Sequence, residues 1–269
     1  MTFSYQFEGS TALITGASSG IGKCFARELA QKRSNLIITS RSTAELEMLA
    51  TELRQEFSVT VDVVTADLST PGAAQKLFAQ VQARKLSVDI LVNNAGFGKW
   101  AHFLDESLDT YDQMLSVNID ALAQLTYLFI PSMLAKGNGG VINVASTAAF
   151  QPLPYIAMYG ASKAFVLNLT EALAAEYKNS RVHFMALCPG NTLTNFAKIA
   201  KANTTGMAAS SPEQVVSLAL SAFSKGNTYL VPGLINYFTS LLPRILTRRM
   251  TTKIVERMFA NRIQKNTSI

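Results

Sequence analysis

The stretch Thr15-Gly16-Ala17-Ser18-Ser19-Gly20-Ile21-Gly22 follows a short apolar run and leads into a helical pattern over residues 20–33. Glycines here allow a tight turn and close backbone approach, and the start of a helix offers free N–H groups to a phosphate. The spacing is GxxxGxG, so the usual GxGxxG dinucleotide fingerprint is not matched. We predict a pyrophosphate-binding loop; the alternative is a glycine-rich turn without a ligand. The predicted contacts are Gly16, Ser18, Ser19, Gly20, Ile21 and Gly22.

The rest of the chain alternates short apolar runs with longer helical patterns. The expected strands are Thr11–Thr15, Asn35–Thr39, Val59–Thr65, Asp89–Asn93, Gly140–Ala145, Arg181–Leu187 and Thr228–Val231. The expected helices are 20–33, 42–56, 71–85, 105–136, 156–178 and 212–224. This alternation predicts right-handed βαβ units. The fold class is therefore α/β, a doubly wound parallel β-sheet of about seven strands with helices on both faces.

Composition indicates a globular protein whose positive charge lies at one end. Of 269 residues, 48% are hydrophobic and 16% are charged, which excludes a disordered chain, a collagen-like repeat and a disulfide scaffold. The net charge of +6 arises in residues 234–269, which hold seven basic residues and one acid, whereas residues 1–233 are neutral. We predict that 1–233 form a dinucleotide-binding and catalytic domain with an inserted loop at 191–211. Residues 234–269 then form a basic amphipathic extension of the same domain, in two pieces broken at Pro243.

The second piece of this extension has two faces at helical spacing. Its apolar residues are Ile254, Val255, Met258, Phe259 and Ile263, and its basic residues are Arg249, Lys253 and Arg257. One interpretation is a helix that packs on its own domain or on a second subunit, and that covers the 191–211 loop as a lid. The other is peripheral contact with an anionic membrane surface. No nucleic-acid partner is expected, because the segment has few aromatic residues and the rest of the chain is neutral.

Cysteine usage and the start of the chain predict a cytoplasmic protein. Cys24 and Cys188 lie far apart, with no second ligand at CxxC or CxxH spacing, so reduced thiols and no metal site are expected. The N-terminus carries an acid and no positively charged leader region. No segment makes a convincing transmembrane helix, since 137–162 and 226–243 contain Gly, Pro and Asn throughout and 121–135 is too short.

The end of the second expected strand bears on the choice of cofactor. Dinucleotide sites usually place an acid there to bind the adenosine ribose, but the sequence reads Thr39-Ser40-Arg41-Ser42. Arg41 can pair with a 2′-phosphate, helped by Ser40 and Ser42, which favours NADP(H); the alternative is a solvated surface arginine. Asp67 and Leu68 follow the third strand and are expected at the adenine, where Asp67 accepts from the amino group or instead caps the next helix.

A second constellation predicts proton transfer. Tyr159-Gly160-Ala161-Ser162-Lys163 places a tyrosine and a lysine one helical turn apart on one face, although such a pair also occurs on ordinary surfaces. A phenol with a pKa near ~10 is a poor acid–base catalyst at neutral pH, and a nearby ammonium favours the phenolate. Ser146 ends the fifth strand, where its hydroxyl can hold a substrate carbonyl. The fourth strand runs into Asn93-Asn94-Ala95-Gly96, and Asn118 lies in the helix that follows.

Together these motifs resemble the short-chain dehydrogenase/reductase family over about residues 9–233. The motifs that occur in the family's order are TGASSGIG at 15–22, NNAG at 93–96, Asn118, Ser146, YGASK at 159–163 and PGNTLT at 189–194. The resemblance implies a Rossmann-like, seven-stranded sheet. It also implies a catalytic tetrad of Asn118, Ser146, Tyr159 and Lys163.

The resemblance further implies a role for each of these residues. Ser146 and Tyr159 hydrogen-bond the substrate carbonyl, and Tyr159 donates the proton while the nicotinamide supplies hydride. Lys163 binds the nicotinamide ribose and lowers the pKa of Tyr159, and Asn118 holds a water in a proton relay. The implied cofactor contacts are Asn94, Ala95, Gly96, Tyr159, Lys163, Pro189, Gly190, Thr192 and Thr194. The glycine loop lacks the basic residue that some NADP-preferring members carry before the second glycine, so preference rests mainly on Arg41.

Two loops indicate the kind of substrate. Apolar residues follow both the NNAG motif and Ser146, which favours a hydrophobic ketone, aldehyde or acyl group, although core packing explains some of them. The predicted lining is Phe97, Trp100, Phe150 and Tyr155. His102 is expected to face solvent, His183 to lie in the core, and Cys188 to line the nicotinamide pocket without acting as a nucleophile.

These features predict an NADP(H)-dependent carbonyl reductase or alcohol dehydrogenase that forms a homo-oligomer, either a dimer or a tetramer. A 3-oxoacyl or hydroxysteroid-type reductase is the alternative within the same chemistry. A non-catalytic dinucleotide-sensing protein is the alternative from another class. The complete tetrad argues against a sensor, because a sensor needs neither Tyr159 nor Lys163.

Overall fold

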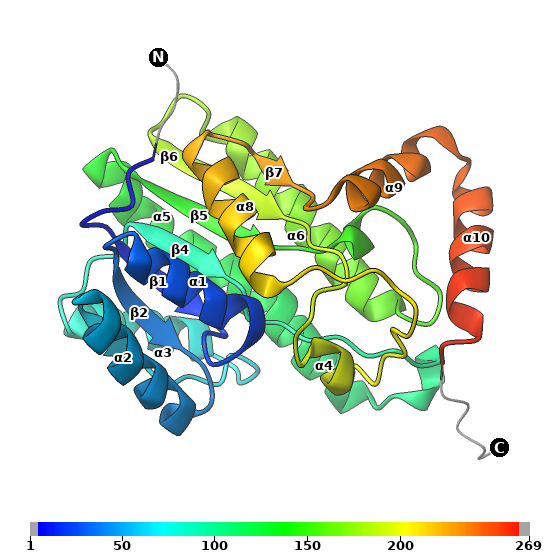
Figure 1. Ribbon diagram of the computed structural model, residues 1–269, viewed down its shortest axis with the longest axis horizontal. Coiled ribbons are helices and arrows are strands. Elements are labelled where there is room, and N and C mark those ends of the chain that lie inside the picture. Colours follow the sequence, from blue (N-terminus) through cyan, green and yellow to red (C-terminus); the bar gives the residue numbers. More distant parts are fainter. Residues whose placement is uncertain (1–4, 264–269) are drawn as a thin grey trace.

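The computed structural model describes residues 5–263 and contains one parallel sheet (Figure 1). Its strands are β1 (Thr11–Thr15), β2 (Asn35–Thr39), β3 (Val61–Val63), β4 (Ile90–Asn93), β5 (Gly139–Val144), β6 (Val182–Leu187) and β7 (Tyr229–Leu230). The seven strands lie in the order β3-β2-β1-β4-β5-β6-β7. The predicted doubly wound α/β fold is confirmed. The strand order reverses between β1 and β4, and ligands bind at such a switch point, beyond the carboxyl ends of the strands.

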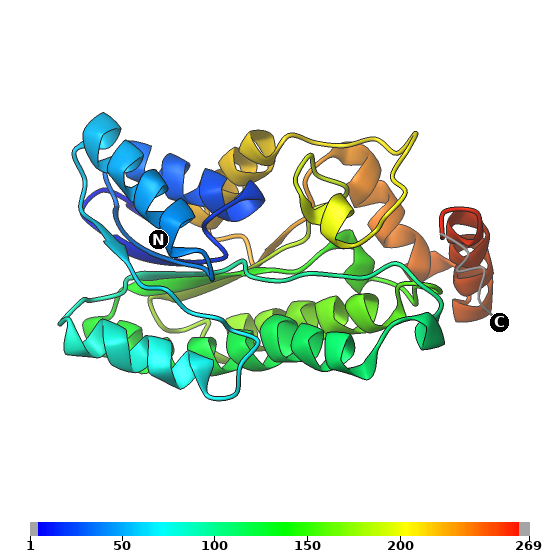
Figure 2. The ribbon, with the colours of Figure 1, turned by 90° about the horizontal axis from the view of Figure 1, so that it is seen from below.

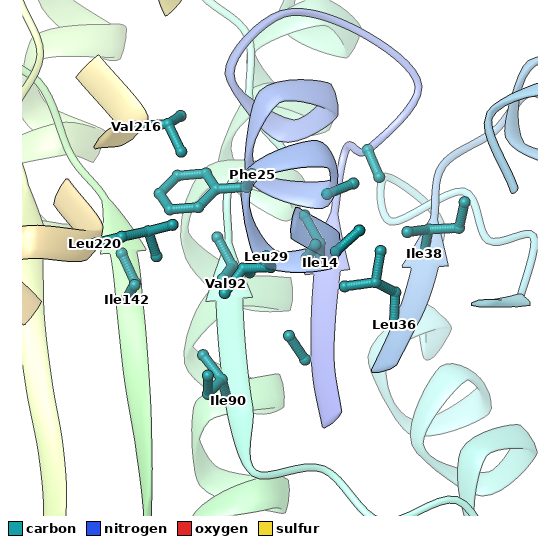
Figure 3. Close-up of a cluster of buried hydrophobic side chains, with 14 of the residues drawn as sticks. Ile14, Phe25, Leu29, Leu36, Ile38, Ile90, Val92, Ile142, Val216 and Leu220 are labelled. Atoms are coloured by element: carbon teal, nitrogen blue, oxygen red, sulfur yellow. The ribbon is translucent and has the colours of Figure 1, made fainter. Parts of the chain in front are cut away.

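Helices cover both faces of this sheet (Figure 2). The first face carries α1 (Gly20–Gln31), α2 (Thr43–Phe57) and α8 (Pro212–Ser224), and the second carries α3 (Ala73–Ala83), α5 (Leu122–Lys136) and α6 (Ala157–Glu176). Alternate strand residues point to opposite faces. Ile14 therefore belongs to one buried cluster with Phe25 of α1 and Leu220 of α8 (Figure 3), whereas Leu13 belongs to another with Phe129 of α5. Each of these buried side chains stabilises the fold by about 1.5–3 kcal/mol, which holds the strand ends of the site in place.

The helix predicted over 105–136 is interrupted. After a 3-10 turn at Phe103–Asp105, it consists of α4 (Leu108–Leu115), a π-helical turn (Ser116–Ala121) and α5. A π turn inserts one extra residue into a helix, often at a functional site, and this one contains Asn118. The whole run Leu108–Lys136 is long and apolar enough to cross a membrane. Its buried side nevertheless packs on the sheet, for example through Phe129, and that packing accounts for its apolar composition.

The C-terminal extension forms two helices, α9 (Leu234–Ile245) and α10 (Arg248–Ala260). The predicted break at Pro243 is wrong, because Pro243 lies inside α9. A proline in the last turn removes one backbone donor, yet Leu246 N still donates to Leu242 O at 2.9 Å. Thr247 then caps the start of α10, because its hydroxyl accepts from Met250 N at 3.3 Å. The inserted loop at 191–211 contains one short helix, α7 (Phe196–Ile199).

Candidate active site

The loop between β1 and α1 has the geometry to hold a pyrophosphate. Gly16 and Gly20 have positive φ angles of 65° and 54°, which favour glycine. A Cβ on Gly22 would clash with Gly16 O and would lie 2.5 Å from Asn94 Nδ2. Ser19 precedes α1 but makes no side-chain cap bond, and the first turn of α1 contains no acid. The N–H groups at the start of α1 are therefore available to an anion, so these residues fit the pyrophosphate of a nicotinamide dinucleotide.

Residues beyond the glycines hold this loop against the end of β4. Thr15 Oγ1 accepts from Asn94 N (3.0 Å) and from Ala95 N (2.9 Å). The Asn94 side chain donates to Thr15 O (2.9 Å) and to Gly16 O (3.2 Å). Asn94 and Ala95, predicted as cofactor contacts, thus position the glycine loop. The sequence does not reveal this role of Thr15. The ends of β1 and β4 are far apart in the sequence and become neighbours only through the order of strands in the sheet.

The adenosine end of the site contains Arg41 and Asp67, both exposed. Burial disfavours the Asp67 carboxylate, but hydrogen bonds from Ser69 and the positive charge of Arg41 leave the pKa of Asp67 below its usual value. The Asp67 carboxylate accepts from Ser69 N (3.0 Å) and Ser69 Oγ (2.7 Å), so one of its oxygens shapes the local turn. Leu68 is buried beside it. Arg41 and Asp67 are therefore close enough to interact with one ligand.

The two serines next to Arg41 shape the turn after β2. The Ser42 hydroxyl accepts from Glu45 N and caps α2. The Ser40 hydroxyl accepts from Ser42 N at 3.3 Å. Arg41 is therefore the group at this strand end that is best placed to meet a phosphate.

Asn118 is fully buried in the π-helical turn. Its Oδ1 accepts from Phe97 N (3.1 Å), and its Nδ2 donates to Phe97 O (3.0 Å) and to Ser162 Oγ (3.0 Å). A Cβ on Gly96 would lie 2.9 Å from Asn118 Oδ1 and 3.3 Å from Lys163 Nζ, which explains the glycine of the NNAG motif. The Asn118 side chain thus positions the loop after β4 beside the lysine, and both of its amide hydrogens are used in doing so.

Ser146, Tyr159 and Lys163 meet at the carboxyl end of β5. Ser146 lies two residues beyond the end of β5, and its hydroxyl donates to Pro189 O at 3.4 Å. α6 presents Tyr159 and Lys163 one turn apart, with Lys163 Nζ 5.8 Å from the centroid of the tyrosine ring. Lys163 Nζ donates to Val144 O at 2.7 Å. The structure thus brings the predicted serine, tyrosine and lysine into one site.

Burial governs the protonation of Tyr159 and Lys163. It raises the pKa of Tyr159 to about 12, against a smaller lowering by the Ser146 hydroxyl. Burial lowers the pKa of Lys163 to about 8. That Lys163 lowers the pKa of Tyr159 stays a prediction; in this structure the lysine ammonium is directed at Val144 O. Tyr159 is therefore a proton donor near neutral pH, and Lys163 is charged below about pH 8.

The segment after β6 lies against the glycine loop. A Cβ on Gly20 would lie 3.1 Å from Thr194 Cγ2, so Thr194 packs directly on the predicted pyrophosphate loop. Thr192 Oγ1 donates to Gly190 O at 3.1 Å and stiffens the turn between them. The predicted PGNTLT residues therefore link the glycine loop to the tetrad.

The cysteines and histidines take no part in this arrangement. Cys188 is buried, and burial raises its pKa to about 12, so its thiol is a poor nucleophile. His102 is exposed, with its ring 5.0 Å from that of Tyr155. His183 is half-buried, and its Nε2 lies 2.9 Å from Asn227 O. Within residues 5–263, no group of His, Cys, Asp and Glu is arranged to hold a metal ion.

An apolar wall borders the tyrosine. Trp100 and Tyr155 belong to the same apolar cluster as Tyr159, and α10 contributes Val255 and Phe259 to it. The rings of Trp100 and Phe259 meet edge to face at 4.9 Å. α10 therefore borders one side of the site; its role as a lid stays a prediction.

Two predicted lining residues also make other contacts, and the structure brings one further ring to the tyrosine. Phe150 packs in a different cluster, with residues of β6 and β7. Phe97 contributes its backbone to the contacts of Asn118. The structure adds Phe196 of α7, whose ring lies 5.3 Å from that of Tyr159. The sequence does not reveal Phe196, because the loop around it has no helical or strand periodicity.

Comparison with known proteins identifies the family of this chain. A family model described as short chain dehydrogenase matches residues 10–205. The chain belongs to the short-chain dehydrogenase/reductase family. It is accordingly an oxidoreductase of the kind that acts on alcohol and carbonyl groups with a nicotinamide cofactor. The family predicted from the motifs is confirmed.

Relatives of this dehydrogenase match along nearly the whole chain. A very-long-chain 3-oxoacyl-CoA reductase of Anas platyrhynchos is 30% identical over 266 residues, which are 96% of this chain and 83% of that protein. A short-chain dehydrogenase from Sphingobium yanoikuyae, solved in complex with NADPH, has a TM-score of 0.80 at 28% identity, covering 97% of this chain and 98% of that one. A 7β-hydroxysteroid dehydrogenase has a TM-score of 0.84 at 27% identity, covering 95% and 99%.

Proposed function

We propose that this short-chain dehydrogenase/reductase reduces the carbonyl group of a hydrophobic substrate with NADPH. The observation that carries the proposal is the position of Tyr159. Its phenol interacts with the Ser146 hydroxyl, and its ring lies near the Lys163 ammonium. The same ring forms part of an apolar wall with Trp100 and Phe259. When bound, NADPH supplies the hydride.

The chain's own groups account for the proton and for the orientation of the carbonyl. Because its pKa is raised to about 12, Tyr159 carries its proton at neutral pH, and we assign this proton to the carbonyl oxygen, to which Ser146 can donate a second hydrogen bond. Lys163, charged below about pH 8, offers its ammonium to the ribose hydroxyls. The apolar wall limits the access of water to the reacting carbonyl.

The preference for NADPH rests on Arg41. Its guanidinium lies at the end of β2, where a dinucleotide fold places the adenosine ribose, and it can pair with a 2′-phosphate. The uncapped start of α1 and the Thr194 contact on Gly20 supply the rest of the cradle. The NADPH complex of the similar Sphingobium yanoikuyae dehydrogenase supports this assignment.

A second candidate substrate is a 3-oxoacyl thioester. One finding favours it, namely the 30% identity to a very-long-chain 3-oxoacyl-CoA reductase over 96% of this chain. An acyl chain would suit the apolar wall of Trp100, Tyr155 and Phe259 as well as a ketone does. A hydroxysteroid-type carbonyl has weaker support, from the structural similarity to the 7β-hydroxysteroid dehydrogenase.

We also propose a homo-oligomer that works in the cytoplasm. Large apolar side chains are exposed on the helices of the second sheet face, at Leu108 (77%), Tyr127 (78%) and Phe165 (40%), which suits contact between copies. Cys24 and Cys188 are free thiols, as suits a reducing compartment. Sedimentation of the purified chain tests the assembly, and a monomer at all concentrations would contradict it.

The activity is tested with a panel of hydrophobic ketones, aldehydes and 3-oxoacyl thioesters, followed by the loss of NADPH absorbance. Tyr159→Phe should lower turnover at least about a hundredfold, because it removes the proton donor. Tyr177→Phe, a matched change just beyond the far end of α6, should leave turnover unchanged. Tight binding of NADPH without turnover of any carbonyl would contradict the proposal.

A further inference from the structure

The outward sides of α9 and α10 carry an unusual amount of exposed apolar surface. Exposure reaches 77% at Leu234, 63% at Phe238 and 80% at Ile245. We call the following set the outer face: Leu234, Ile235, Tyr237, Phe238, Leu242, Ile245, Met250, Ile254 and Met258. These nine are half of the eighteen exposed large apolar residues within residues 5–263, so the exposure is concentrated here. Exposed apolar residues gathered on two consecutive helices indicate an interaction surface, whereas single exposed residues do not.

α9 has the reverse orientation of an ordinary surface helix. Leu234, Phe238, Leu242 and Ile245 recur at intervals of three and four and therefore lie on one side. Ser240, on the opposite side, is the buried residue of this helix. A helix that only served the core of its own domain would bury the apolar stripe and expose the serine. The stripe on α9 is thus directed at something other than this domain.

Basic side chains border the outer face on α10. Lys253 and Arg257 are exposed beside the row formed by Met250, Ile254 and Met258. Residues 234–263 contain six basic residues and one acid. No salt bridge formed within residues 5–263 uses any of these cations. The surface therefore combines exposed apolar groups with unneutralised positive charge.

The inner sides of the same two helices are anchored to the active site. α10 places Phe259 against Trp100, in the cluster that contains Tyr159. Asn236 of α9 packs closely on Gly190: a Cβ added to Gly190 would lie 2.6 Å from Asn236 Nδ2. Figure 1 shows α9 leaving the end of β7 and α10 running along the edge of the molecule. Whatever the outer face binds is thus held next to the substrate side of the site.

We propose that the outer face docks on the surface of an anionic phospholipid bilayer. The apolar stripe then enters the boundary between headgroups and acyl chains, and Lys253 and Arg257 lie at the level of the lipid phosphates. A second copy of this chain would cover the apolar residues too, but it would bring two sets of unneutralised cations together. An anionic surface neutralises the charges that a second copy repels. Docking would also let a hydrophobic carbonyl compound pass from the bilayer to the apolar wall.

Co-sedimentation of the full chain with phosphatidylcholine vesicles, with and without phosphatidylglycerol, tests this proposal. Binding should be at least about tenfold stronger when phosphatidylglycerol is present. Ile235→Ser combined with Phe238→Ser should lower partitioning more than about tenfold, through lost apolar burial. Lys253→Gln combined with Arg257→Gln should lower it about thirtyfold, at about fivefold per cation.

Matched controls carry the same changes elsewhere on the surface. Met48→Ser with Leu218→Ser removes two apolar side chains that are 67% and 49% exposed on α2 and α8. Lys178→Gln with Arg181→Gln removes two exposed cations between α6 and β6. Both controls should bind vesicles like the parent chain. Equal binding to the two vesicle types, or controls as impaired as the outer-face variants, would overturn the proposal.

Solution mass and activity distinguish bilayer docking from self-association and from misfolding. All variants should keep the parent's melting temperature and its turnover of a water-soluble ketone, since none of the changed residues contacts the tetrad. If Ile235→Ser with Phe238→Ser lowers the mass of the chain in solution without vesicles, the outer face belongs to a second copy and the bilayer assignment is wrong. Vesicle binding is measured without substrate, so its failure is distinct from a failure of carbonyl reduction.

Discussion

Replacing Arg41 with glutamine tests how this enzyme distinguishes its cofactors. Arg41 is exposed just beyond β2, and within residues 5–263 its side chain makes no hydrogen bond, so pairing with a phosphate breaks no existing hydrogen bond. A hydrogen bond to a charged group contributes about 1.5–3 kcal/mol. The bond between Arg41 and the 2′-phosphate should lie at the lower end of this range, because Arg41 is exposed to solvent. About 1.4 kcal/mol corresponds to tenfold in affinity. Arg41→Gln should therefore raise the Kd of NADPH about tenfold.

Calorimetric titration of NADPH and NADH, each against the parent and the variant, measures this effect. The Kd of NADH should not change, because NADH lacks the 2′-phosphate. Arg181→Gln, which removes an exposed arginine at the amino end of β6, should alter neither value. Equal weakening of both cofactors, or an unchanged Kd for NADPH, would refute the role of Arg41.

Three further measurements probe the loop, the wall and the lysine. Gly22→Ala should abolish measurable NADPH binding in the same titration, because its Cβ would clash with Gly16 O. Phe259→Ala should raise KM for a hydrophobic ketone several-fold with little change in kcat, since its contact with Trp100 contributes about 0.5–1.5 kcal/mol. The pH profile of kcat/KM for reduction should be level below the Lys163 pKa of about 8. Above it, loss of the ammonium should lower kcat/KM about tenfold per pH unit.

Each of these three predictions has a result that would contradict it. Parent-like NADPH affinity in Gly22→Ala would mean that the loop adapts to a Cβ. A lower kcat at unchanged KM in Phe259→Ala would place that ring in the reaction rather than in substrate binding. A profile that stays level well above the Lys163 pKa of about 8 would mean that Lys163 keeps its proton in the working enzyme.

Neighbouring elements of the fold differ in how well their sequence predicts them. β1, the glycine loop and α1 are predictable because each depends on local properties, namely an apolar run, positive φ angles and helical periodicity. The π-helical turn Ser116–Ala121 cannot be predicted in this way, because a π turn inserts a residue into a helix without changing the composition of the helix. Pro243 misleads for a related reason, because a proline in the last turn costs one hydrogen bond and the packing of α9 tolerates it.

The order of motifs along the chain determined the family and the sheet and predicted the residues of the tetrad, because these depend on local conformation and on side-chain chemistry. Only the tertiary structure decided how the tetrad is protonated: burial sets the pKa of Tyr159 near 12 and that of Lys163 near 8, and burial is a property of packing. It also decided that Phe196 and Phe259, distant in sequence, close around the tyrosine. The same holds for α9, whose amphipathic pattern is visible in the sequence. Contacts with the rest of the chain alone decide that its apolar side points outward.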